Sequence, residues 1–146
     1  MFEFINIMVR ISDEDLIKEL EKNSRIPFTE LAEKFKVSEA AIRKRIKKLL
    51  RNGIIKFSLD INYKELGYDY TAIIGIDTLP EHLMKVIEML KEDKEVKELY
   101  SSTGDHMLLV KVVFKTSDGL NRFVKKLEKN KMITKVCPAI IVERLK

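Results

Sequence analysis

The most informative stretch of this chain is FTELAEKFKVSEAAIRKRIKKLLRNGIIKF, residues 28–57. Their apolar residues recur at helical spacing on both sides of a break at residues 36–37, which predicts two helices joined by a tight turn. Ser38 is suited to cap the second helix, and Gly53 suits the left-handed position that ends it. The apolar run 54–59 that follows predicts a β-strand.

Positive charge is concentrated in the same stretch. Residues 36–56 contain eight basic side chains and one acidic side chain, Glu39, a net charge of +7, whereas the whole chain of 146 residues carries +5. A basic helix that follows a tight turn is suited to bind the phosphate backbone of DNA. The alternative is a basic face that is only solvated, but the preceding helix, the turn and the following strand favour DNA binding.

The helix over residues 38–51 is expected to be a recognition helix. Its buried stripe is predicted from the spacing i, i+4, i+7 and i+8 of Ile42, Ile46, Leu49 and Leu50. The first turns of such a helix meet base edges in the major groove, so Arg43 is expected to read a guanine and Ala41 to touch a thymine methyl group. Later basic residues are expected to contact phosphates. The predicted DNA-binding residues are Ser38, Glu39, Ala41, Arg43, Lys44, Arg45, Lys47, Lys48 and Arg51.

A second unit follows this region. Its patterns alternate in the order β-α-β-β-α-β, with strands expected at 71–78, 96–102, 107–114 and 133–145 and helices at 80–91 and from Ser117. This order is that of the ferredoxin-like fold. The predicted fold class is therefore α+β, with an N-terminal winged helix-turn-helix domain and a C-terminal ferredoxin-like βαββαβ domain. The expected boundaries are 1–59 for the first domain, 60–70 for a connector and 71–146 for the second domain.

The strands of the second unit are apolar on both faces. Segments 72–76 and 108–110 hardly alternate between apolar and polar residues. A sheet with helices on one face alone should carry polar residues on the other, so some further surface must cover it. A second copy of the same sheet is the simplest cover and predicts a homodimer; the N-terminal segment is the alternative cover.

The composition argues against membrane, secreted and metal-binding proteins. No apolar run reaches the roughly 18–20 residues of a membrane span, and the opening MFEFINIMV lacks the basic start and the cleavage site of a signal peptide. A single cysteine, Cys137, excludes an internal disulfide, and the two histidines form no metal-binding or catalytic spacing. We therefore expect a cytoplasmic protein that is not an enzyme and has no cofactor, no metal and no membrane partner.

Together these features resemble the Lrp/AsnC family of bacterial and archaeal regulators. The resemblance covers nearly everything after Arg10 and rests on the helix-turn-helix stretch, the connector KELGYD and the segment STGDHMLLVKV of the second unit. It implies a sequence-specific regulator of transcription that binds double-stranded DNA. It also implies a C-terminal domain that dimerises, often assembles into tetramers or octamers, and often binds a free amino acid at the contact between dimers.

The effector site that the resemblance implies is a loop of the second unit. From spacing alone, Gly104-Asp105-His106 is a turn; the resemblance adds an amino-acid site. Met107 stands where the family usually has an aspartate, and Pro138 where it usually has a threonine. Because Met is soft and apolar, an apolar or sulfur-containing amino acid is favoured over lysine or arginine. The alternative is an empty loop that serves only the packing of dimers. The implied effector-binding residues are Ser101, Thr103, Gly104, Asp105, His106 and Met107.

Two other functions compete with this interpretation. The first is an enzyme of the same architecture that resembles sirohaem decarboxylases. Such chains use histidines near a porphyrin and typically carry an Arg-Arg pair where this one has Lys56-Phe57. The second is an interaction module that has lost DNA binding, against which the intact basic helix argues.

Overall fold

The computed structural model describes residues 11–146 of the chain. The segment considered above as a signal peptide lies outside the described residues. The chain divides into two compact units, one that ends at Asp60 and one that runs from Ile61 to Lys146.

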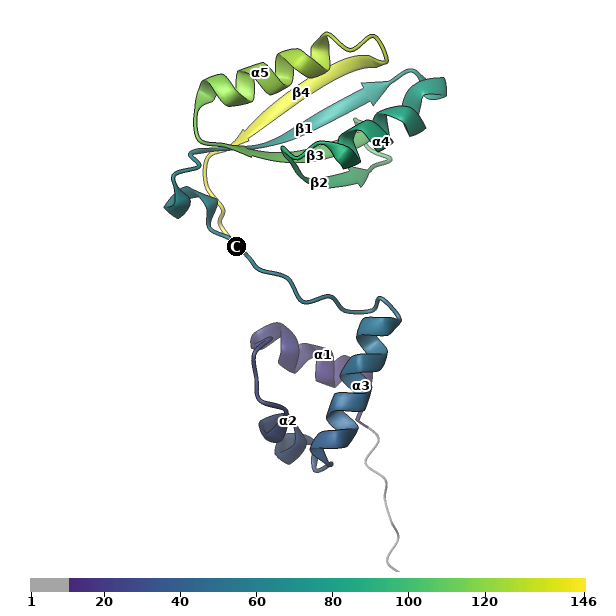
Figure 1. Ribbon diagram of the computed structural model, residues 1–146, viewed down its shortest axis with the longest axis vertical. Coiled ribbons are helices and arrows are strands. Elements are labelled where there is room, and N and C mark those ends of the chain that lie inside the picture. Colours follow the sequence, from purple (N-terminus) through teal and green to yellow (C-terminus); the bar gives the residue numbers. More distant parts are fainter. Residues whose placement is uncertain (1–10) are drawn as a thin grey trace, which may run out of the picture. The chain divides into compact units, whose positions relative to one another are not determined.

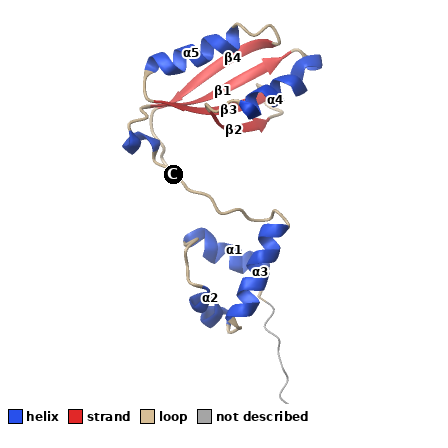
Figure 2. Ribbon diagram, viewed as in Figure 1, coloured by secondary structure: helices blue, strands red, loops and turns tan. Residues whose placement is uncertain are grey.

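The N-terminal unit contains three helices (Figures 1 and 2): α1 spans Asp13–Lys22, α2 spans Phe28–Phe35 and α3 spans Glu39–Arg51. The side chain of Ser12 accepts a hydrogen bond from the N–H of Asp15 and caps α1. Between α2 and α3, Lys36 has a φ of 55° and its N–H donates to carbonyls of the last turn of α2. The predicted pair of helices joined by a tight turn is therefore confirmed.

The core of this unit is made by side chains from all three helices, which explains why the helices stay together. Its buried residues are Ile11, Leu16, Leu20, Ile26, Leu31, Ala32, Ile42, Ile46 and Leu49. The expectation that Leu50 is buried is wrong, because its side chain is 39% exposed. Successive residues of a helix lie about 100° apart, so a stripe centred on Ile42, Ile46 and Leu49 leaves Leu50 at its edge.

The β-strand predicted over residues 54–59 is also wrong. After Gly53, whose φ is 67°, the N–H groups of Ile54 and Ile55 donate to the carbonyl of Leu49, and the chain then continues without regular structure. A strand needs a hydrogen-bonded neighbour. Within residues 11–146 no segment pairs with this one.

The C-terminal unit has the predicted order of elements. Its parts are β1 (Tyr70–Thr78), α4 (Leu83–Glu92), β2 (Val96–Ser101), β3 (Leu108–Phe114), α5 (Ser117–Glu128) and β4 (Ile133–Ile141), with short 3₁₀ turns at Tyr63–Leu66 and Pro80–His82. The strands form one antiparallel sheet in the order β2-β3-β1-β4. The last strand ends four residues earlier than predicted, because its pairing with β1 ends where Ile141 lies opposite Thr71, near the start of β1. The α+β class and the ferredoxin-like βαββαβ plan are confirmed.

Helices α4 and α5 cover one face of this sheet (Figure 1). Alternate residues of the central strands, such as Ile74 of β1 and Val110 of β3, are buried against Leu90 of α4 and Phe123 of α5. A β-strand directs successive side chains to opposite faces, so residues between these lie on the other face. That face is called the open face here.

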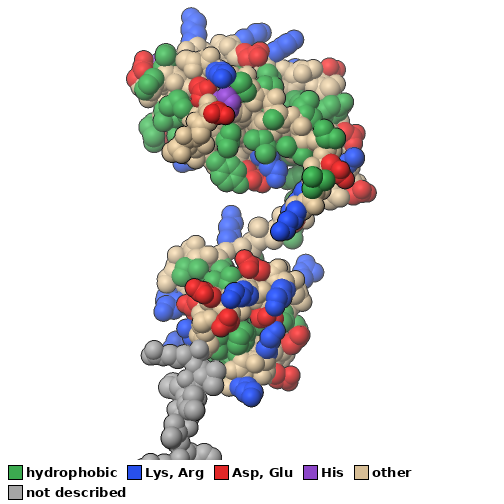
Figure 3. All heavy atoms as spheres, turned by 180° about the vertical axis from the view of Figure 1, so that it is seen from behind, with side chains coloured by type: hydrophobic (Ala, Val, Ile, Leu, Met, Phe, Trp, Pro, Cys, Tyr) green, Lys and Arg blue, Asp and Glu red, His purple; other side chains and the backbone are tan. Residues whose placement is uncertain are grey.

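The open face carries apolar side chains that remain accessible. Ile73 on β1 is 38% exposed and Tyr100 on β2 is 54% exposed. An ion pair between Lys111 Nζ and Glu98 Oε1, 2.8 Å long, lies beside them. Figure 3 shows the back of the molecule, where hydrophobic side chains are spread over the C-terminal unit. In the described residues no helix is long and apolar enough to cross a membrane.

Candidate nucleic-acid interface

One face of α3 is directed away from the core of the N-terminal unit. A shallow hollow on this face is called the basic face here. It is lined by Glu39, Ala40, Arg43, Lys44, Lys47, Lys48 and Arg51. Five of these seven residues are cationic. Since the buried side chains of α3 fix its orientation on α1 and α2, the five cations are held on one side of the unit, where they can meet the phosphates of a nucleic acid.

Most of the predicted DNA-binding residues meet on this face, but three do not. Ser38 is the N-cap of α3, and its hydroxyl accepts a hydrogen bond of 3.2 Å from the N–H of Ala41. Ala41 and Arg45 are not among the residues that line the basic face. Ala40, which the sequence analysis missed, does line it. A signal for it exists in the sequence, because residues 40, 44, 47 and 51 recur at helical spacing opposite the buried stripe.

Arg45 belongs to a contact between helices. Its Nε lies 2.5 Å from Oδ1 of Asp13, so this ion pair joins α3 to the first turn of α1. Both side chains are more than a third exposed, and ion pairs of this kind contribute about 0.2–1 kcal/mol to stability. The guanidinium of Arg45 therefore joins α3 to α1 and does not line the basic face.

Arg43 has two neighbours in the structure. Its Nη2 lies 2.6 Å from Oε1 of Glu39, one turn earlier on α3. Its guanidinium carbon lies 5.0 Å from the centre of the ring of Phe28, the first residue of α2. The side chain is still 52% exposed. Arg43 is thus held between two helices while part of its guanidinium remains accessible.

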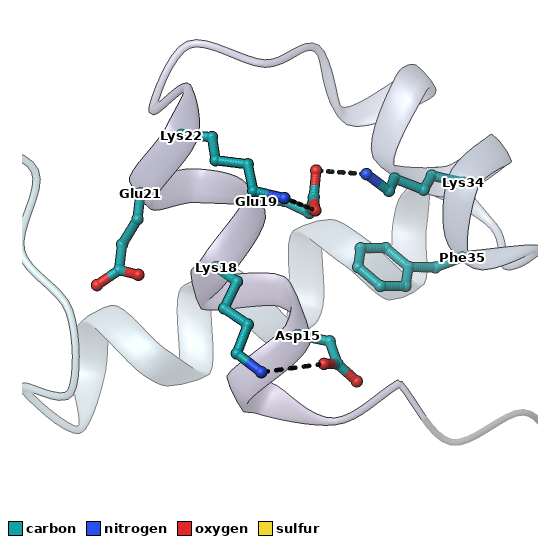
Figure 4. A pocket seen from close by; sticks show the side chains of 7 residues that line it. All are labelled: Asp15, Lys18, Glu19, Glu21, Lys22, Lys34 and Phe35. Atoms are coloured by element: carbon teal, nitrogen blue, oxygen red, sulfur yellow. Dashed lines mark hydrogen bonds and ion pairs between the residues drawn. The ribbon is translucent and has the colours of Figure 1, made fainter.

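A second charged cluster joins α1 to α2 and differs from the basic face in its charge balance (Figure 4). Glu19 accepts a hydrogen bond of 2.5 Å from Lys34 and another of 2.9 Å from Lys22. These two contacts, first with Lys34 and then with Lys22, hold the pKa of Glu19 below its ordinary value. The hollow around it contains as many acidic as basic residues, so it lacks the excess positive charge that binding to phosphates needs.

The predicted effector loop closes on itself. The N–H of Ser102 donates to the carbonyl of Met107 over 2.9 Å, and the N–H of Gly104 donates to Oγ of Ser102 over 3.1 Å. The N–H of Met107 donates to Oδ1 of Asp77 over 2.9 Å. Three backbone N–H groups of the predicted effector loop are therefore already paired within the protein.

Asp77 is the residue of this region that the sequence analysis missed. Besides accepting from Met107, its Oδ2 lies 3.0 Å from Nδ1 of His106. The hydrogen bond from the Met107 N–H, and then the contact with His106, hold the pKa of Asp77 below its ordinary value against the opposing effect of desolvation. The pairing of Ile76 with Leu108 brings the end of β1 beside the start of β3. Had this antiparallel register been predicted, Asp77 would have been placed beside the loop.

Within residues 11–146 no cluster of three or more His, Cys, Asp or Glu side chains could hold a metal ion. The basic helix that follows a tight turn, packed on two other helices and joined to a βαββαβ unit, defines a helix-turn-helix DNA-binding protein.

Comparison with known proteins agrees with this class. The model of the winged helix-turn-helix DNA-binding domain matches residues 10–56, and the model of the Lrp/AsnC ligand binding domain matches residues 71–146. The chain belongs to the Lrp/AsnC family and is a DNA-binding regulator of transcription. The resemblance predicted from the sequence is thereby confirmed.

Individual relatives span nearly the whole chain. The HTH-type transcriptional regulator LrpA of Pyrococcus horikoshii is 45% identical over 141 residues, which cover 95% of this chain and 100% of that protein. The regulator of the same name from Pyrococcus abyssi is 46% identical over 141 residues, with the same coverage of both chains. Among solved structures, AsnC of Escherichia coli is 28% identical, with a TM-score of 0.80 over 93% of this chain and 95% of that one.

Proposed function

We propose that the protein is a homo-oligomeric regulator that binds a pseudo-palindromic DNA site through the basic face of α3 and acts in the cytoplasm. The observation that carries this proposal is the gathering of five cations on one exposed side of a helix whose other side is buried. In the proposed organisation, residues 1–59 bind DNA, residues 60–70 connect, and residues 71–146 join the subunits and contain an effector site.

The basic face divides into two parts by position along α3. Arg43 lies in the first half, the part of a recognition helix that reaches base edges, and we assign it to a guanine. Lys47, Lys48 and Arg51 follow in the second half and are assigned to phosphates. Ala40, which is small and lies on the same face, would let the helix approach the bases closely.

The open face of the sheet is the proposed contact between subunits. Ile73 and Tyr100 are exposed on it, and an apolar surface left in water favours association. A two-fold contact between the open faces of two subunits would cover Ile73 and Tyr100 of each subunit. The resulting dimer would present two recognition helices, which suits half-sites about 34 Å apart or a multiple of that distance.

For the effector we propose an apolar or sulfur-containing amino acid near the loop 101–107. Met107 in place of the acid usual in the family supports an apolar side chain over a basic one. The pairing of the N–H groups of Gly104 and Met107 within the protein favours the alternative, in which the loop only packs dimers together. No enzymatic activity is proposed, since the relatives that match the chain are named as transcription regulators.

Titration of fluorescent DNA with the protein at several salt concentrations tests the proposed DNA contacts. A dimer with two basic faces would neutralise roughly 6–10 phosphates, so log K should fall with log salt by about 0.9 for each of them. Lys47→Ala should lower the slope and weaken binding to all sequences alike. Lys85→Ala on α4, which also removes an exposed lysine, is the control and should leave binding unchanged. A nearly flat salt dependence would contradict the proposal.

A further inference from the structure

We propose that Phe28 and Glu39 position Arg43 for base recognition, so that α2 contributes to sequence specificity without touching DNA. The inference rests on the proposed DNA-binding role of α3. Phe28 is the first residue of α2 and is partly buried against the core of the N-terminal unit. Its ring is therefore held in place by packing and offers a fixed surface to the guanidinium of Arg43.

The geometry restrains Arg43 from two directions. The ring of Phe28 covers one side of the guanidinium at 5.0 Å, and the carboxylate of Glu39 accepts from Nη2 at 2.6 Å. A planar guanidinium stacks well on an aromatic face, and its charge attracts both the ring and the carboxylate. The many rotamers of a free arginine are thus reduced to a few before DNA arrives.

The restraint leaves Arg43 able to bind a base. A guanidinium has five N–H donors, and Glu39 engages one of them. Two further donors suffice for the O6 and N7 atoms of guanine. Because ordering a long side chain on binding costs free energy, an arginine ordered in advance binds more tightly and in a defined direction.

The other cations of the basic face differ from Arg43. In the described part of the chain, Lys44, Lys47, Lys48 and Arg51 have no ion pair and no contact with an aromatic ring. Such free side chains suit phosphates, which can be reached from many directions and carry no sequence information. The single restrained cation of the face is therefore the one assigned to base reading.

The test compares binding to a selected DNA site with binding to the same site changed at one base pair, the pair at which Arg43→Ala relaxes discrimination. Phe28→Leu keeps an apolar side chain in the core and removes the aromatic face. We expect it to lower the ratio of the two affinities about three- to tenfold, and Phe28→Tyr, which keeps the ring, to leave the ratio as in the wild type. Glu39→Gln lies on the surface, keeps the size of the side chain and should also lower the ratio. It serves as the second variant if Phe28→Leu fails to fold.

Combination with Arg43→Ala separates positioning from a structural effect. If Phe28 acts through Arg43, Phe28→Leu changes the ratio in the wild type and leaves it unchanged when Arg43 is already Ala. Equal weakening of both DNAs by Phe28→Leu, or a further drop of the ratio in the double variant, would overturn the inference. If wild-type protein binds DNA but Arg43→Ala relaxes discrimination at no base pair of the selected site, Arg43 does not read a base and the inference is overturned as well. Absence of any DNA binding by the wild type would instead refute the proposed role of α3.

Discussion

The imidazole ring of His106 lies against Gly75 of β1. A Cβ placed on Gly75 would lie 2.1 Å from Cδ2 of His106, a distance that the two atoms cannot adopt. The same ring contacts Asp77, two residues further along the strand, through its Nδ1 at 3.0 Å. Gly75 leaves the space that the ring of His106 occupies, and the carboxylate of Asp77 binds that ring. Together they keep the loop 102–107 against the sheet.

Replacement of Gly75 by Ala should therefore displace the ring of His106 and weaken its contact with Asp77. We expect the free energy of unfolding to fall by about 1–3 kcal/mol, as for other insertions of a methyl group into a filled space. Denaturation in urea measures the change. Gly104→Ala is the matched control in the same loop, since the nearest atom to its Cβ would be Oγ of Ser102 at 3.5 Å. Equal stability of the two variants would contradict the close contact.

The lowered pKa of Asp77 predicts a dependence of stability on pH. The N–H of Met107, and then His106, favour the charged carboxylate in the folded state, so Asp77 stabilises the fold above its unfolded-state pKa of about 3.9. This contribution is lost as the pH falls through the lower folded-state pKa. The difference in unfolding free energy between wild type and Asp77→Asn should thus be at its full value above about pH 5 and shrink below about pH 4. A difference that is constant from pH 3 to pH 7 would disprove this role.

The ion pair between Arg45 and Asp13 predicts different effects for two neighbouring cations of α3. Arg45→Ala should lower the free energy of unfolding by about 0.2–1 kcal/mol and leave DNA affinity nearly unchanged. Lys47→Ala should weaken DNA binding and leave stability unchanged. Thermal denaturation and DNA titration of both variants check this. If Arg45→Ala weakened DNA binding as much as Lys47→Ala, Arg45 would belong to the interface, as the sequence analysis predicted.

The proposed contact between open faces predicts that a charge there prevents association. Ile73→Asp should yield a folded monomer at micromolar concentration, because an unpaired carboxylate in an apolar interface is costly. Met84→Asp is the control, since Met84 is 68% exposed but lies on α4, away from the open face. Sedimentation measures the mass of each variant. Wild-type assembly of Ile73→Asp would exclude the open face as the contact.

Calorimetric titration with the twenty amino acids addresses the effector. Heat is expected with apolar or sulfur-containing amino acids, because Met107 offers an apolar and polarisable surface in place of an acid. A preference for lysine or arginine would show that the argument from Met107 is mistaken. No heat with any amino acid would favour a loop that only packs dimers together.

Local signals in the sequence were enough for most of the fold. Ser38 caps α3 as predicted, because a cap depends on residues three positions apart. The order of strands and helices in the C-terminal unit was likewise predicted from periodicity. The strand at 54–59 could not be judged in this way, because its apolar residues satisfy the pattern while the hydrogen bonds depend on a partner segment.

The candidate DNA interface likewise combines features that depend on local sequence with features that depend on distant segments. The gathering of cations on α3 follows from the sequence alone, since helical periodicity relates each residue to those three and four positions away. Which of these cations have partners depends on the packing of the helices, because Asp13 of α1 contacts Arg45 and Phe28 of α2 contacts Arg43. Asp77 and His106 likewise meet across 29 positions of the chain. Such contacts depend on how helices and strands pack, and a periodic pattern carries no information about partners that lie so far apart.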